Sequence, residues 1–185
     1  MKQINRTDRL LLKILEPNYD DAARILDFQY RNDPIFQRFE PEHSEDFFTL
    51  DHQMRLLEAE YNAALRISMI RFWIYRQEFP FEPIATMSFR GITQGCEQSC
   101  KIGYKMDLEY WHHGYMTEAV EAGIALIFRE IDLHRIIATI MPENLPSIRL
   151  AKRVGFHFEG LEEKAYQVNG RWEDHERWAL INPNH

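Results

Sequence analysis

The chain has 185 residues, 45% of them hydrophobic, and a formal net charge of −7 at pH 7. This length and composition predict one domain with its own hydrophobic core, and the negative charge argues against nucleic acid as a primary partner. No apolar run is long enough to span a membrane and the first residues lack a signal-peptide core, so we expect a cytoplasmic protein with no membrane contact. Two cysteines, Cys96 and Cys100, predict free thiols in a hairpin loop and no zinc site.

The first half of the chain predicts strands and helices in alternation. We expect residues 9–15 to form the first strand and a helix to begin at Asp20 and break at Asn32-Asp33-Pro34. A second helix is expected from Ser44, as N-cap, to about residue 65. Residues 68–76 and 84–92 have the pattern of antiparallel strands joined by a rigid loop over 79–83.

The stretch from residue 101 to 156 organises the rest of the chain. Residues 101–107 predict a strand, and the helix that opens after Gly114 carries apolar residues spaced by three and four. Residues 135–141 are nearly all apolar, as in a buried parallel strand. Asn144 suits the N-cap of a second helix that stops at Gly155. Residues 156–158 and 166–169, an Asn169-Gly170 turn and a strand over 172–181 complete a mixed α/β fold with one central, strongly bent sheet.

A strand–helix–strand unit binds ligands beyond the carboxyl ends of its parallel strands. The turn His113-Gly114-Tyr115 lies at such an end, where free amides and a helix N-terminus attract phosphate. One glycine before a helix is more often only a turn, so both interpretations of this stretch stay open.

Residues 103–160 resemble the acyl-CoA-binding core of the GNAT acetyltransferase superfamily. Its Q/R-x-x-G-x-G/A turn aligns with residues 111–116, where Trp111 and Met116 depart from the family pattern. Further segments are similar to the RimJ/RimL branch, which N-acetylates ribosomal proteins: Thr117-Glu118-Ala119, Asn144 with Ser147, Val154-Gly155-Phe156 and Asn169-Gly170-Arg171-Trp172.

The resemblance implies a single GNAT-type domain over residues 1–185, with its acyl-CoA-binding core at about 101–160, and an acetyl-CoA-dependent N-acetyltransferase without a metal. The backbone amide of Met106 would polarise the thioester carbonyl. Ser147 is the first choice to protonate the leaving thiolate, because position 151, a Tyr in many family members, is Ala; Tyr166 is the second choice. The cofactor-binding residues it implies are Lys105, Met106, Trp111, His112, His113, Gly114, Tyr115, Met116, Thr117, Asn144, Ser147 and Lys152.

In the family the first two helices and their connection form one wall of the acceptor groove. This makes Phe39, Glu40 and His43 candidates for substrate contact, with core packing for Phe39 and a solvated turn for Glu40 as the alternatives. The preferred acceptor is a protein N-terminal amine, such as that of a ribosomal protein. A polyamine-like or antibiotic small amine, or a degenerate acyl-CoA-binding module without turnover, are the alternatives. The C-terminal aromatic residues are compatible with a homodimer or with core packing.

Overall fold

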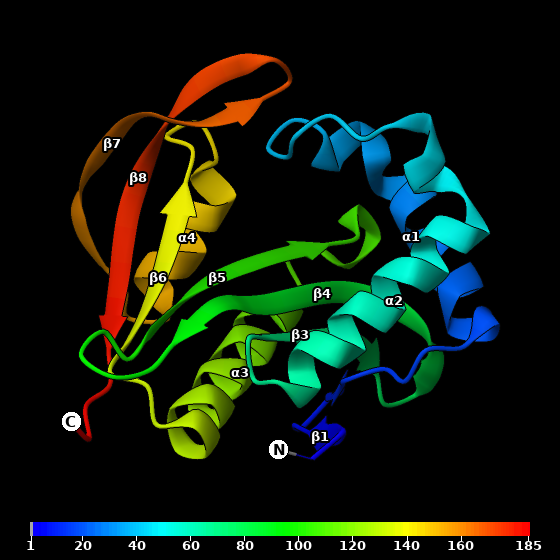
Figure 1. Ribbon diagram of the computed structural model, residues 1–185, viewed down its shortest axis with the longest axis horizontal. Coiled ribbons are helices and arrows are strands. Elements are labelled where there is room, and N and C mark those ends of the chain that lie inside the picture. Colours follow the sequence, from blue (N-terminus) through cyan, green and yellow to red (C-terminus); the bar gives the residue numbers. More distant parts are fainter. Residues whose placement is uncertain (1) are drawn as a thin grey trace.

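One mixed eight-stranded sheet runs through the molecule in the order β1-β2-β3-β4-β5-β6-β8-β7 (Figure 1). The computed structural model describes residues 2–185. The strands are β1 (Ile4–Arg6), β2 (Leu10–Lys13), β3 (Met69–Arg76), β4 (Phe79–Thr93), β5 (Ser99–Met106), β6 (Arg135–Ile140), β7 (His157–Val168) and β8 (Arg171–Ile181).

Strands β5 and β6 form the parallel pair of this sheet, and their ladder is short. It joins Ser99–Ile102 to residues 135–138 and then stops, although β5 continues to Met106. Beyond the last pair the two strands diverge, and Figure 1 shows β6 rising away from β5. The sheet is therefore bent at this seam, as the sequence predicts, and one edge of β5 is left open.

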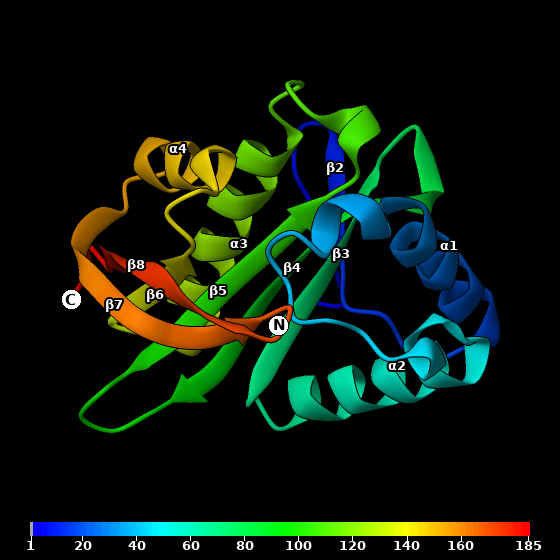
Figure 2. The same cartoon turned by 90° about the horizontal axis from the view of Figure 1, so that it is seen from above.

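Two pairs of helices cover different parts of the sheet (Figure 2). Helices α1 (Tyr19–Phe36) and α2 (Leu50–Leu65) bury a small core against the Trp73 and Tyr75 side of β3. Helices α3 (Tyr115–Ile131) and α4 (Leu145–Arg153) pack with the larger core on the other side. A Cβ on Gly123 of α3 would meet the end of the Met87 side chain, which would have to shift.

The strand–helix–strand–helix prediction over residues 101–156 is confirmed. Asn144 caps α4, its side-chain oxygen accepting from the Ser147 amide at 3.2 Å, and Gly155 follows the helix with φ +94°. Asn169 and Gly170, with φ +48° and +75°, form the predicted tight turn between β7 and β8.

Several predictions for the first half were wrong. Helix α1 continues through Pro34 to Phe36. A proline in the last turn costs the helix one hydrogen bond, and the continued turn buries Phe36 with its ring centroid 5.5 Å from that of Phe28. The short strand β1 precedes the strand expected to be first.

Other boundaries also moved. Thr49 caps α2, because residues 45–48 form a separate 3₁₀ turn after Ser44. Residues 79–83 belong to β4, where a register shift against β3 accommodates Pro83. Strand β7 is continuous from 157 to 168. Both thiols are free, but Cys100 lies buried within β5, outside the expected loop, and burial raises its pKa to about 12.

Candidate active site

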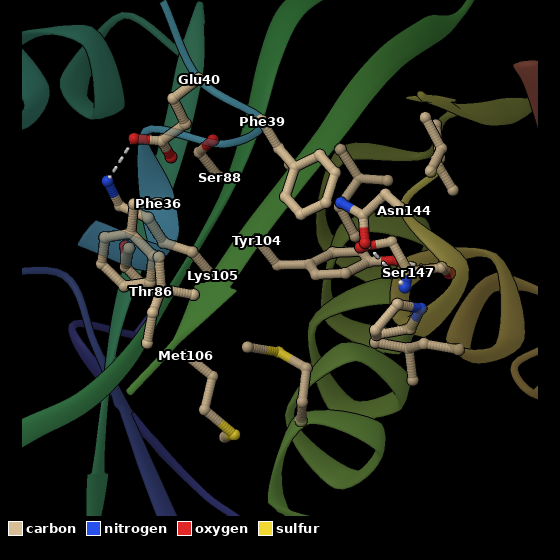
Figure 3. A pocket seen from close by; sticks show the side chains of 18 of the residues that line it. Phe36, Phe39, Glu40, Thr86, Ser88, Tyr104, Lys105, Met106, Asn144 and Ser147 are labelled. Carbon is tan, nitrogen blue, oxygen red and sulfur yellow. Dashed lines mark hydrogen bonds and ion pairs between the residues drawn. The ribbon is translucent and has the colours of Figure 1, made fainter. Parts of the chain in front are cut away.

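A cavity of about 830 Å³ crosses the C-terminal half of β5. On one side it is lined by α1, α2 and their connection, and on the other by the starts of α3 and α4 (Figure 3). The sheet floor between them includes Thr86, Ser88, Tyr104 and Met106. The cavity therefore has two halves that meet where β5 has separated from β6.

The register of β4 with β5 shows which backbone groups face the open edge. The Asp107 amide donates to the Ile84 carbonyl at 3.0 Å, so the facing residues Ala85 and Met106 form a non-hydrogen-bonded pair. By the same alternation the amides of Tyr104 and Met106 both point away from β4. Two residues apart on the open edge, they are available to a ligand laid along it as an added strand would be.

The turn before α3 leaves its first amides free. Gly114 is the N-cap with φ +78° and offers no side-chain acceptor, so the amides of Tyr115, Met116 and Thr117 have no helical partner. Arg9 anchors this turn from the N-terminal segment by donating to the His113 carbonyl at 2.9 Å. The helix start combines partial positive charge with unpaired donors, which is how proteins bind phosphate groups.

Trp111 makes a contact that the sequence did not predict. Its indole N–H donates to the Met106 carbonyl at 3.0 Å, which ties the turn to the end of β5. His112 adopts φ +64° and lines the cavity. His113 is exposed outside the cavity lining, with Nδ1 2.7 Å from the Trp111 carbonyl and its ring stacked beside Tyr115.

Glu118 joins α3 to the N-terminal segment. Its carboxylate accepts from the Thr7 hydroxyl at 2.6 Å and from the Arg9 Nε at 2.7 Å. Burial acts to raise the pKa of Glu118, but these hydrogen bonds outweigh it and the pKa lies below its ordinary value.

The start of α4 brings Asn144 and Ser147 to the cavity wall. The Ser147 carbonyl accepts from the Tyr104 hydroxyl at 3.2 Å, and the Ser147 side chain also interacts with that phenol, which acts to lower the Tyr104 pKa. Burial raises the pKa of Tyr104 to about 12, so this phenol keeps its proton and holds α4 to β5 across the open seam.

The basic residues of α4 divide between two surfaces. Arg149 and Arg153 line the cavity, and Arg153 Nη1 donates to the Thr117 hydroxyl at 3.3 Å. Lys152, predicted to contact the cofactor, lies outside the lining, with its ammonium 5.4 Å from the Trp178 ring centroid. The spacing of four places the two arginines on one face of α4, but the sequence does not show which face of the helix turns to the cavity.

We call the half of the cavity lined by α1, α2 and their connection the acceptor half, after its predicted role. It contains all three residues predicted to contact substrate: Phe39, Glu40 and His43. Lys105, predicted on the cofactor side, instead extends its side chain into this half (Figure 3), where its ammonium lies 2.8 Å from the Glu40 carboxylate. Burial lowers the pKa of Lys105. For Glu40 burial acts to raise the pKa, but His43 and Lys105 outweigh it and the pKa is lowered.

A second ion pair, which was not predicted from the sequence, also lies in the acceptor half. Arg71 Nε is 2.8 Å from a Glu60 carboxylate oxygen, and the Trp73 indole approaches the other oxygen at 3.3 Å. Burial raises the pKa of Glu60 despite the opposing charge of Arg71. Strand alternation and helical spacing place these side chains inward, but only the sheet register shows that they share a cavity.

Tyr166 does not join this constellation. It lies outside the cavity lining, and its hydroxyl accepts from the Lys101 ammonium at 2.9 Å. Within residues 2–185 no cluster of His, Cys, Asp and Glu side chains could hold a metal ion. In the same part of the chain, every helix is too short or too polar to cross a lipid bilayer.

An open strand edge that leads to an anion-binding helix start defines a site for an extended, phosphate-bearing ligand. Comparison with known proteins identifies the class: the acetyltransferase (GNAT) domain family matches residues 9–157, and the chain belongs to this family. It is an acetyl-CoA-dependent N-acetyltransferase.

Individual relatives span almost the whole chain. The probable N-acetyltransferase YjcK of Bacillus subtilis is 36% identical over 165 residues, covering 89% of this chain and 90% of the relative. The ribosomal protein uS5-alanine N-acetyltransferase of Escherichia coli is 29% identical over 180 residues, covering 96% and 90%. The crystal structure of the ribosomal-protein-S5-alanine acetyltransferase of Vibrio fischeri superimposes with a TM-score of 0.90 at 28% identity, covering 98% and 97%.

Proposed function

We propose that the acceptor is the α-amine of a protein N-terminus, such as that of a ribosomal protein, acetylated in the cytoplasm. Two uS5-alanine acetyltransferases among the relatives support this acceptor class. The structural observation that carries the proposal is the pairing of the acidic side chains in the cavity with cations. Among residues 2–185, the carboxylates that line the cavity are Glu40 and Glu60, and each is paired with a cation, Lys105 or Arg71.

A paired carboxylate is a poor base for an amine of high pKa. An α-amine has an ordinary pKa near 8, against about 10.4 for a lysine side chain. At neutral pH an appreciable fraction of an α-amine is already unprotonated, and water beside Glu40 and His43 is sufficient to accept the last proton. A lysine would need an unpaired carboxylate as its base, and among residues 2–185 both carboxylates of the cavity are paired with cations.

The residues in the other half of the cavity, at the starts of α3 and α4, fit acetyl-CoA. The free amides of Gly114 to Thr117 at the start of α3, with Arg149 and Arg153, suit its phosphates. The open amide of Tyr104 suits a carbonyl of its pantetheine arm, which leaves the Met106 amide for the thioester carbonyl. Bound there, acetyl-CoA supplies an activated acetyl group as a thioester. Because it lies outside the cavity, Lys152 is not retained in this proposal, and Lys105 is assigned to the acceptor half.

Three groups at the seam have roles in transfer. The Met106 amide donates toward the carbonyl oxygen that becomes negative in the transition state. Trp111 holds the same peptide segment in place through the Met106 carbonyl. The Ser147 hydroxyl, at the cavity wall beside the Tyr104 phenol, donates a proton to the departing sulfur directly or through water, while Asn144 fixes the backbone at Ser147.

The test is an acetylation assay with purified protein, acetyl-CoA and three acceptors. One peptide carries the N-terminus of uS5, one is N-terminally blocked with an internal lysine, and the third acceptor is a polyamine. Thiol release gives the rate and mass spectrometry locates the acetyl group. Acetylation at the α-amine of the first peptide supports the proposal. A preference for the polyamine would replace it, and acetyl-CoA binding without release for any amine would indicate a binding module.

A further inference from the structure

Two cations, Arg90 at the cavity wall and Lys101 beside it on the next strand, lie together without a counter-charge among residues 2–185. Register pairing places Arg90 of β4 directly opposite Lys101 of β5, and Ser88 directly opposite Gly103. These positions share the sheet face of Thr86 and Lys105, because side chains alternate along a strand. Arg90, Ser88 and Gly103 all line the cavity.

Like charges directly opposite one another on a sheet destabilise it. Arg90 has no ion-pair or hydrogen-bond partner among residues 2–185, and the polar contact of Lys101 is with the neutral Tyr166 hydroxyl. The chain does not lack acids, since 29 Asp and Glu outnumber 22 Lys and Arg. Within residues 2–185 none of these acids pairs with Arg90 or Lys101, and Arg90 is exposed, so the two cations are open to an anion that arrives with a ligand.

The donors converge on one point. A Cβ built on Gly103 would lie 3.7 Å from Arg90 Nη2 and 3.8 Å from the Ser88 hydroxyl oxygen, so both groups border the space that glycine leaves open. Ser88 is only 5% exposed, points into the cavity (Figure 3), and its hydroxyl has no protein partner in the described chain. This hydroxyl faces the cavity and can both donate to and accept from a ligand there.

We propose that Arg90, Ser88 and Gly103, with Lys101 beside them, form a carboxylate subsite for the acceptor. A guanidinium and a hydroxyl supply charge-assisted and neutral hydrogen bonds to the two carboxylate oxygens. Gly103 precedes Met106 by three strand positions, which is about 10 Å. An extended peptide advances about 3.5 Å per residue, so the subsite receives an Asp or Glu at the second or third residue of the acceptor.

This inference rests on the proposed function, since it specifies the acceptor of the same site. The test measures binding of two peptides to the protein–CoA complex by titration calorimetry. The peptides begin with Ala and differ only in Glu or Gln at positions two and three. Wild-type protein is compared with Arg90→Gln, with Ser88→Ala, and with Arg6→Gln, a matched loss of one exposed positive charge on β1, outside the cavity.

We expect the Glu peptide to bind the wild type and Arg6→Gln about 10-fold more tightly than the Gln peptide. In Arg90→Gln the ratio should fall close to one with unchanged affinity for the Gln peptide, and Ser88→Ala should reduce it less. High salt should also reduce the wild-type ratio. Equal affinities in the wild type, or a ratio that survives Arg90→Gln, would overturn the subsite while leaving N-terminal acetylation intact.

Failure of the acceptor proposal has a different signature. If no peptide binds or is acetylated, the same variants are assayed with an aliphatic ω-amino acid and its ω-amide as acceptors. Faster acetylation of the acid, lost in Arg90→Gln, would support the subsite with a small acceptor. No preference between acid and amide would overturn it.

Discussion

Replacing Gly114 with Asp tests the anion-binding role of the turn before α3. The backbone there is left-handed, which costs a side chain about 1 kcal/mol, and a Cβ would meet only Arg9 Nη2, at 3.5 Å. Asp is also a favourable N-cap residue, so the fold should tolerate the change. A carboxylate about 4 Å from a bound phosphate costs about 1 kcal/mol in water and about 4 kcal/mol at an effective dielectric of 20.

Arg9 lies beside the new carboxylate and favours the lower part of that range. Since 1.4 kcal/mol is a factor of ten, the Kd of acetyl-CoA should rise by about 10- to 100-fold. In thermal shift, acetyl-CoA at 100 times the wild-type Kd stabilises the wild type by about 2.7 kcal/mol, or about 5–10 °C in Tm. The shift should shrink to a few degrees or vanish in Gly114→Asp.

Two controls separate charge from strain. Gly114→Ala has the backbone cost without the charge, and Gly95→Asp makes the same exchange at another left-handed glycine with no atoms near its Cβ position. Both should retain most of the acetyl-CoA shift. The reasoning is refuted if Gly114→Asp binds acetyl-CoA as tightly as Gly114→Ala, because the phosphates would then lie elsewhere.

Three further predictions concern the seam and its supports. Ser147→Ala should lower kcat at least 10-fold with little change in the KM for acetyl-CoA, whereas Tyr166→Phe should stay within about two-fold of wild type; steady-state kinetics showing the reverse would exchange their roles. Trp111→Phe removes one hydrogen bond, so we expect about 1 kcal/mol less stability in urea unfolding and a lower kcat; unchanged kcat would show that the Met106 segment holds its position without the indole. Glu118→Gln should lose about 1 kcal/mol at neutral pH. Because the folded pKa of Glu118 is depressed, this difference should persist above the ordinary pKa near 4.5 and disappear as pH falls through the folded value; a difference independent of pH would exclude the carboxylate charge as its cause.

Local signals were sufficient for the second half of the fold. The spacing of apolar residues after Gly114, the cap at Asn144 and the turn at Asn169 each report on their immediate neighbours, and each was predicted correctly. Pro34 shows the limit of such signals. Proline reads as a helix breaker in isolation, but in the last turn its cost is small against the burial of Phe36.

The acceptor half could not be predicted in the same way. Glu60, Arg71 and Ser88 come from α2, β3 and β4, and only the sheet register brings them to one cavity. Whether Lys152 or Arg153 faces the cavity could not be predicted from the sequence either. Neighbouring helix residues point in directions that differ by 100°, and the packing of α4 decides which of the two faces inward.

The position of the active site follows from the relative strengths of the ladders around it. Strand β5 stays paired with antiparallel β4 as far as Met106, and β6 stays paired with antiparallel β8 as far as Ile140. Parallel pairing is slightly weaker per residue, so separating β5 from β6 beyond their fourth pair costs least. The separation exposes the Tyr104 and Met106 amides, and the Tyr104 hydroxyl then bridges to the Ser147 carbonyl of α4. The pair of strands that costs least to separate is thus the pair between which a ligand can bind along the open edge of β5.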